Sequence, residues 1–314
     1  MTYKNRFIFL VSLIAVLALV YIANIIFTSN LTGSGSSAYA WLDSKSAPKI
    51  SRISVNSGEQ DYELVRKNNN WFVSYNGHEY PARQARIDDL LSSLTKRAEY
   101  PVRTSSVSAH ERFGVGDDAP GAVLHGDFSV ILGLFLGNDD VLKNESYYRK
   151  AGQNEVRSGS GDIKSYLKGS ANTWYNLRLV TDSEGGNVDI ENVQRVSVYS
   201  GNQTQIFSRK NRGWEISGIK ADNPSAVNIE AYIRSILSIE GDNFADFYLR
   251  DDPMFGNNRI VIEFGNAGIT AIHLSEADET GRVHAYISGG EFVYSIPSWA
   301  AGRLYRDASS FEAQ

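Results

Sequence analysis

The 314-residue sequence predicts an α+β protein with an N-terminal transmembrane helix and two tandem homologous repeats, each an antiparallel sheet with a helix. Three observations predict it: an apolar run at residues 7–27, an internal repeat, and a change of hydrophobic period inside each copy. Residues 51–74 return as 194–217 at a constant offset of 143, with eleven identities in 24 aligned positions. Because a repeated segment forms a repeated structural unit, this repeat sets the organisation of the chain.

The apolar run at residues 7–27 carries no charge and is dominated by Ile, Leu, Val, Ala and Phe. As a helix it is about 30 Å long, which is enough to cross a bilayer core. Lys4 and Arg6 precede the run, and the next charge is Asp43. The positive-inside rule then predicts a cytoplasmic tail at residues 1–6 and export of everything after the helix. The expected location is the bacterial inner membrane, with the bulk of the chain in the periplasm.

A cleaved signal peptide is the alternative, since residues 38–40 (Ala-Tyr-Ala) fit the small-x-small cleavage pattern. The apolar run is longer than the usual apolar core of about 7–15 residues, and the cleavage pattern lies far beyond its end. An uncleaved anchor fits the sequence better.

Residues 28–48 are predicted to be a flexible linker, because residues 32–37 contain only Thr, Gly and Ser. Without Lys4 and Arg6, 29 of the 31 basic side chains remain against 36 acidic ones. An acidic domain without clustered Lys and Arg argues against nucleic acid or anionic lipid headgroups as the main partner. The chain has no cysteine, which rules out disulfides, thiolate metal sites and a lipoprotein anchor.

The first repeat, residues 49–180, begins with three expected strands at 50–55, 62–66 and 71–75. These short runs are separated by Gly-rich and Asn-rich turns, which is typical of an antiparallel meander. The period then changes, because Ile87, Leu90, Leu91 and Leu94 have the i, i+3, i+4, i+7 spacing of one helix face.

The second repeat, residues 191–314, follows an inter-repeat linker at 181–190, whose expected flexible middle is 182–187. Its helix is predicted from Ile229, Ile233, Ile236 and Leu237, with Asn223 as the N-cap and Pro224 as the first helical residue.

Further pairs of segments complete the two copies. Strands are expected at 130–136 and 269–274, and again at 147–149 and 284–287. A short helix is expected near the end of each copy, at 163–167 and 298–305. The predicted unit is therefore three strands, a helix, and three or four more strands.

The chain resembles a bacterial family of uncharacterised single-pass membrane proteins with a duplicated periplasmic domain. The resemblance rests on the N-terminal anchor, the basic-then-Trp strand, and short motifs spread along the chain. These motifs are Trp71, Pro81-Ala82 before the first helix, Phe113-Gly114, Tyr147-Tyr148-Arg149, and Trp174 with Leu177. One residue departs from the pattern, because Arg83 stands where family members often have an acidic residue.

This resemblance implies a role beside a gliding-motility-type ABC transport system. The implied partners are its permease and ATPase, its substrate-binding-like subunits, and a polymer or polysaccharide cargo. The family supplies no catalytic residues to transfer to this sequence.

Catalytic, cofactor and metal motifs are weak throughout. Ser165 and Lys168 have the Ser-x-x-Lys spacing of penicillin-recognising enzymes, but the companion motifs are missing. The five histidines have no metal-ligand spacing. Residues 138–145 contain carboxylates and amides that suit a hard cation, yet they lack the order of a calcium loop. We therefore predict no catalytic, cofactor or metal residues.

Aromatic residues are the better candidates for binding. Trp71 and Trp214 occupy the same repeat position and are expected in the core. The predicted exposed interaction patch consists of Tyr147, Tyr148, Trp174 and Tyr175.

The function expected from these observations is a non-enzymatic, membrane-anchored periplasmic subunit that binds a protein or a polymer. Two alternatives remain open. One is an envelope hydrolase with carboxylates converging from the two repeats. The other is a tethered solute-binding protein with a pocket between the repeats.

Overall fold

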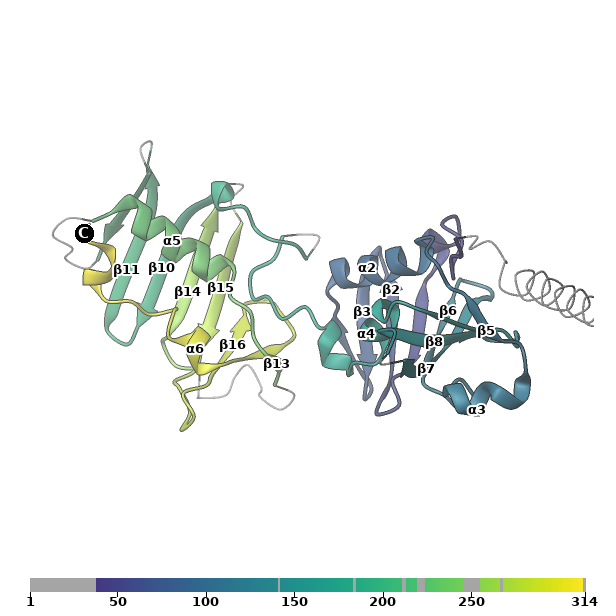
Figure 1. The fold of residues 1–314 in the computed structure, drawn as a ribbon. Coiled ribbons are helices and arrows are strands. Elements are labelled where there is room, and N and C mark those ends of the chain that lie inside the picture. The colour runs from purple at the N-terminus through teal and green to yellow at the C-terminus, as the bar shows by residue number, and fades with distance from the viewer. Residues whose placement is uncertain are drawn as a thin grey trace, which may run out of the picture. The chain divides into compact units, whose positions relative to one another are not determined.

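The computed structural model describes residues 38–140, 142–182, 185–210, 213–218, 224–245, 255–265 and 268–312. The predicted tail at 1–6, the transmembrane helix at 7–27 and residues 28–37 of the predicted linker lie outside these ranges. The described residues form two antiparallel sheets with few helices (Figure 1), so the α+β class is confirmed at this level. No helix within these ranges has the length and apolar character needed to cross a bilayer.

The first sheet has nine strands in the order β4-β3-β2-β1-β6-β7-β8-β9-β5. Its strands are β1 (Arg52–Asn56), β2 (Asp61–Lys67), β3 (Asn70–Tyr75), β4 (His78–Pro81), β5 (Val102–Thr104), β6 (Gly121–His125), β7 (Val130–Asp140), β8 (Glu145–Lys150) and β9 (Val156–Gly159). The helices nearby in the chain are η1 (Ala47–Lys49), α2 (Gln84–Thr95), η2 (Val107–Ala109), α3 (His110–Phe113), α4 (Asp162–Leu167) and η3 (Ala171–Trp174).

The second sheet has eight strands in the order β12-β11-β10-β14-β15-β16-β17-β13. Its strands are β10 (Val193–Ser200), β11 (Gln203–Lys210), β12 (Gly213–Ser217), β13 (Asn243–Phe244), β14 (Arg259–Phe264), β15 (Ile269–Leu274), β16 (Val283–Ile287) and β17 (Val293–Ile296). The helices are η4 (Ile190–Asn192), α5 (Ala226–Leu237), α6 (Ser298–Ala301) and η5 (Ala308–Phe311).

The two strand orders correspond when β4 is set aside, because β1 then matches β10 and β6 matches β14. In each sheet a central strand, β1 or β10, is followed in the chain by the hairpin strands beside it, β2 and β3 or β11 and β12, and then by a long helix. The chain later adds β6 or β14 on the other side of that central strand. This shared order is the one expected for an internal repeat. The strands β6 and β14, each next to the central strand, are additions to the strands predicted from the sequence.

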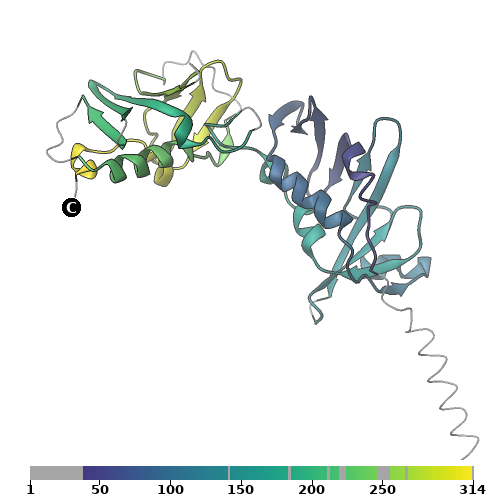
Figure 2. The same cartoon turned by 90° about the horizontal axis from the view of Figure 1, so that it is seen from above.

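A helix covers one face of each sheet. Figure 2 shows α2 and α5 each lying along a face of its own sheet. The predicted apolar faces are buried, since Ile87, Leu90 and Leu94 in α2 and Ile229 and Ile233 in α5 are inaccessible to solvent. The predicted helices are therefore confirmed, and the opposite face of each sheet is here called its outer face.

Trp71 and Trp214 are both buried, as predicted, with 4% and 6% of their surface exposed. Each pairs across the hairpin with the repeated arginine, Trp71 with Arg66 and Trp214 with Arg209. The repeated Arg-Trp pattern therefore builds the same cross-strand pair in both sheets.

The start of α5 differs from the prediction. The helix begins at Ala226, and the side chain of Ser225 caps it by accepting a hydrogen bond from the Asn228 backbone amide. Pro224 instead forms an isolated bridge with Glu312, and Asn223 lies outside the described residues. The final short helix is also shorter than predicted, because α6 ends at Ala301.

The end of the predicted flexible linker is folded. Tyr39 pairs with Ala98, and both Trp41 and Leu42 are buried. The Leu42 amide donates to the carbonyl of Leu94 at 3.0 Å. Two adjacent large apolar side chains bury this segment, although its polar neighbours are typical of a linker.

The chain divides into two compact units. One contains the residues up to Asp61 together with Asp88–Gly169, and the other contains Tyr62–Ile87 together with Ser170–Gln314. The segment 182–189 and η4 belong to the second unit.

Candidate functional site on the outer face of the second sheet

The predicted aromatic patch does not form an exposed surface. Tyr148 and Trp174 are fully buried, and Tyr175 is 5% exposed. Tyr148 donates a hydrogen bond to the carbonyl of Ser160 at 2.6 Å, and Trp174 Nε1 donates to the Tyr62 hydroxyl at 2.8 Å. A satisfied polar tip lets these amphipathic rings fill the interior, so the position expected for them on the surface is corrected. Tyr147 and Tyr148 belong to the first unit, whereas Trp174 and Tyr175 belong to the second.

Tyr147 is the one half-buried member of the predicted patch. Its hydroxyl donates to Asp140 at 3.0 Å, and its ring makes an edge contact with Phe113 at 4.7 Å. The second sheet repeats this contact between Phe255 and Tyr286 at 4.8 Å. The Phe-Gly motif of each copy therefore places a phenylalanine against a strand tyrosine.

The acidic loop at residues 138–145 is neutralised by protein groups. Asp139 Oδ1 accepts hydrogen bonds from Ser146 and Lys164, both at 2.7 Å, and these bonds hold the pKa of its carboxyl below the ordinary value. Glu145 is paired with Arg103 at 2.8 Å. Within the described ranges, no group of three or more His, Asp or Glu residues is arranged to hold a metal ion.

The serine of the Ser-x-x-Lys pair also has a hydrogen-bond partner in its own helix. The Ser165 hydroxyl donates to the carbonyl of Asp162 at 2.6 Å, and both Ser165 on α4 and Lys168 just after it are exposed. This bond satisfies the serine within its own helix, and the structure provides no activating contact for it.

A cleft of about 780 Å³ with a mixed polar and apolar lining lies in the second unit, between residues 181–194 and the facing ends of β14 and β15. Its lining combines amides, hydroxyls and carboxylates, among them Asn187, Asn192, Gln194, Thr270 and Asp189. Two of its carboxylates already have protein partners, because Asp189 accepts from the Glu191 amide and Glu191 pairs with Arg209. Of these two, only Glu191 has a cationic partner among the described residues, so the cleft keeps negative charge beside its amides and hydroxyls, with Asp182 as a further carboxylate in its lining.

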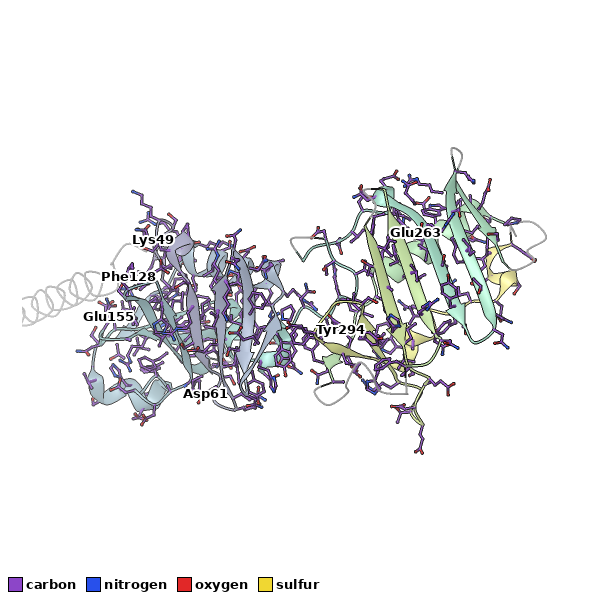
Figure 3. The ribbon with its side chains drawn as sticks, turned by 180° about the vertical axis from the view of Figure 1, so that it is seen from behind. Lys49, Asp61, Phe128, Glu155, Glu263 and Tyr294 are labelled. Carbon is purple, nitrogen blue, oxygen red and sulfur yellow. The ribbon has the colours of Figure 1, made fainter. Side chains whose placement is uncertain are left out.

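A row of four planar side chains crosses the outer face of the second sheet. The strand register places Tyr199 beside Arg259, Arg259 beside His273, and His273 beside Tyr286. We call these four residues the stacked row. The residues next to them along the strands, Val198, Ile260, Ile272 and Ala285, are buried. Because successive strand side chains point to opposite faces, the stacked row lies on the face away from α5, which Figure 3 shows from behind with Glu263 labelled.

Contacts within the row hold its planar groups against one another. The Arg259 guanidinium lies 4.5 Å from the centre of the Tyr199 ring. The His273 and Tyr286 rings are stacked at 4.5 Å with an angle of 5° between their planes. His273 Nε2 also shares a hydrogen bond with the Ser288 hydroxyl at 3.0 Å. These contacts order the side chains in advance, which lowers the entropy lost when a partner binds.

The row carries a positive charge on an exposed side chain. Arg259 is exposed, and among the described residues it makes no ion pair with a carboxylate. Burial, together with the nearby Arg259 charge, lowers the pKa of His273 below its ordinary value. At neutral pH the row therefore presents one positive charge, that of Arg259, which lies between Tyr199 and the neutral imidazole of His273.

The next residues on the same face are small. Ser197, Val261 and Ala271 lie side by side across β10, β14 and β15. Beyond them Arg195 pairs with Glu263 at 3.5 Å. The stacked row therefore stands beside short side chains and a neutralised ion pair.

The sequence contains a partial signal for this site. Arg259 and Glu263 flank the apolar residues 260–262, and in the structure residues 259–263 alternate between accessible and buried positions. The row itself depends on the register of four strands from distant parts of the chain, so spacing along the sequence does not reveal it.

Comparison with known proteins finds a match to a protein family. Residues 71–256, more than half of the chain, match the family described as a domain of unknown function (DUF4340). No curated protein and no solved structure matches the chain.

Proposed function

This chain belongs to the DUF4340 family, and we propose that it is a non-enzymatic, membrane-anchored periplasmic subunit that assists an ABC-type transport system of the gliding type. In this proposal it acts by binding a protein partner through the stacked row. The ABC association comes from the family resemblance of the sequence, and the binding role comes from the site.

The anchor is supported by the sequence before the folded part. Residues 7–27 form an uncharged apolar run preceded by Lys4 and Arg6. Tyr39, in the middle of the alternative cleavage pattern, is already part of the fold, where it pairs with Ala98 and packs against Trp41 at 5.0 Å. Cleavage after Ala40 would remove Tyr39 and these contacts from the fold, which favours an uncleaved anchor.

The stacked row is the observation that carries the binding proposal. Tyrosine and arginine are the residue types that dominate binding energy at protein interfaces. Here Arg259 is held against Tyr199 and Tyr286 against His273, on the face of the sheet away from α5. A preorganised flat surface of this composition suits a protein partner that places a carboxylate on Arg259.

In-membrane crosslinking of the tagged full-length protein, followed by affinity purification and mass spectrometry, tests the proposal. We expect permease or ATPase subunits to be recovered with the natural protein. We expect their recovery to fall at least tenfold for the double variant Arg259→Ala/Tyr286→Ala, as loss of two interface anchors predicts.

The matched control is Arg97→Ala/Tyr75→Ala, which makes the same two changes at accessible positions of the first sheet region. Recovery of the transporter subunits with the control, but not with the row variant, supports the proposal. Equal recovery with both variants contradicts a role for the row, and recovery of the natural protein alone contradicts the auxiliary-subunit function.

The cleft beside β14 and β15 favours a second candidate, a tethered solute-binding protein. Its amide and hydroxyl lining suits a neutral polyhydroxylated ligand. Calorimetric titration with neutral oligosaccharides tests it, with Gln194→Ala/Thr270→Ala as the variant. Binding that the variant abolishes would favour this candidate over the auxiliary subunit.

A further inference from the structure

Two apolar side chains are almost completely exposed at opposite ends of β7. Phe128, in the turn before β7, is 100% exposed, and Leu142, after its end, is 98% exposed. The strand has 11 residues, so the two side chains lie roughly 35–45 Å apart along it, at about 3.3 Å per residue. A fully exposed phenylalanine is costly in water.

The Phe128 end is apolar and carries charges of both signs, because the exposed Asp127 lies next to Phe128 in the chain. We call residues 126–129, the turn between β6 and β7, the hairpin tip. Val130, at the start of β7, is 60% exposed beside Phe128. Lys49 lies next to the tip, because a side chain at Gly126 would come within 3.3 Å of the Lys49 carbonyl. Lys49 is exposed.

The first described residues of the chain approach the same end of the sheet. The turn between β8 and β9 lies there, because the Ala151 amide donates to the carbonyl of Gly133 near the start of β7. Glu155 closes that turn, and the next residue but one, Arg157, lies over the Tyr39 ring at 4.2 Å. Figure 3 labels Lys49, Phe128 and Glu155 at this one end of the first sheet.

We propose that this end of the first sheet faces the bilayer and that Phe128 inserts between the lipid headgroups. The inference rests on the membrane anchor of the proposed function. Ten residues, 28–37, separate the apolar run from Ala38, and a chain of that length reaches at most about 33–36 Å. The tether therefore keeps the entry point of the fold close to the membrane surface.

Proximity makes a weak insertion effective. A single phenylalanine binds a bilayer poorly by itself, but the anchor turns its insertion into an intramolecular step at high effective concentration. Aromatic rings favour the interface between headgroups and acyl chains. The hairpin tip then restricts how the periplasmic domain is oriented above the membrane.

The absence of cysteine from the sequence permits a clean test with single labels. Phe128→Cys and Leu142→Cys full-length proteins are each labelled with the fluorophore NBD. They are then reconstituted in vesicles of phosphatidylethanolamine and phosphatidylglycerol. Lipids with nitroxide groups at different depths quench a label that enters the bilayer. We expect the Phe128 label to be quenched at a depth of about 5–10 Å, the depth at which interfacial groups insert, and its emission to shift to the blue.

The Leu142 label is the matched control, because it is equally exposed and lies at the far end of the same strand. It should keep the emission of a water-exposed label and escape lipid quenching. Equal emission and equal quenching of the two labels, whether weak or strong, would overturn the inference. Release of the protein from the vesicles by carbonate would overturn the anchor as well, which distinguishes the two failures.

Discussion

Equivalent rows of residues on the two sheets differ in exposure. In the second sheet Tyr199, Arg259, His273 and Tyr286 stand on the outer face as the stacked row. In the first sheet the register places Asn56 beside Gly121, Gly121 beside Phe135, and Phe135 beside Arg149. Asn56 and Tyr199 are matched by the repeat offset of 143, so the two rows occupy equivalent positions.

Arg149 turns the first row inward. Its side chain is 5% exposed, and its guanidinium lies 4.3 Å from the centre of the Phe135 ring. Nε donates to the carbonyl of Val115 at 2.7 Å, and a terminal nitrogen pairs with Asp117 at 2.6 Å. The arginine therefore fastens the segment after α3 onto the outer face of the first sheet.

The difference teaches that one repeat can use a row for packing while the other presents it to solvent. Both rows contain an arginine stacked on an aromatic ring. In the first sheet that arginine is buried by its own chain, whereas Arg259 is exposed. An arginine with its donors satisfied inside the fold stabilises, and one held open on a preorganised surface is available to bind.

The strongest test asks whether shared positions are structural in both copies. Trp71→Ala and Trp214→Ala should each lower the free energy of unfolding by about 3–5 kcal/mol, because each removes a buried aromatic ring. Chemical denaturation of the full-length protein in detergent, followed by circular dichroism, measures the loss. Unchanged unfolding of both variants would show that these side chains do not support the sheets.

The arginines of the two rows should behave differently. Arg149→Ala should lower the free energy of unfolding by about 2–3 kcal/mol, because the buried carbonyl of Val115 loses its charged donor. Arg259→Ala should change it by less than about 0.5 kcal/mol, as expected for an exposed side chain. The same denaturation measurement compares them, and equal losses would break the distinction between a packed and an open row.

Gly121, which takes the position of Arg259 in the first row, should be sensitive to any side chain. A Cβ there would lie 2.3 Å from the carbonyl oxygen of Leu134, so the backbone must shift. Gly121→Ala should lower the free energy of unfolding by about 1–2 kcal/mol. Gly256→Ala is the control, since a Cβ at Gly256 meets no atom within 4 Å. A neutral effect of Gly121→Ala would show that the first row has room for a larger residue.

The smallest expected effect is on the titration of His273. Its pKa is lowered, mainly by burial and further by Arg259, so the folded protein binds a proton less readily than the unfolded chain. This costs no stability above the ordinary histidine pKa of about 6.5, and the folded state loses stability as the pH falls below it.

Proton NMR titration of the His273 ring checks this sign. Arg259→Ala should raise the pKa towards the ordinary value without restoring it fully, because the burial remains. An unchanged pKa in that variant would show that Arg259 does not act on the imidazole and that the row is not electrostatically coupled.

Much of the architecture was predictable because it depends on local pattern. The spacing of Leu90 and Leu94 predicts α2, and the repeat predicts equivalent tryptophans in the two cores. The aromatic patch was misplaced because composition does not tell which face of a strand a ring occupies. Tyr148 is buried and Tyr147 is half-buried, although they are adjacent in the chain.

The sequence by itself determined the α+β class, the repeated sheet-and-helix unit and the buried tryptophans, because each follows from periodicity or from self-similarity along the chain. Tertiary structure alone decided which residues meet across strands. Tyr199 and Tyr286 are 87 positions apart in the sequence, yet Arg259 and His273 join them into one row. Such a row depends on strand register, and register is set by the packing of whole sheets rather than by any short segment.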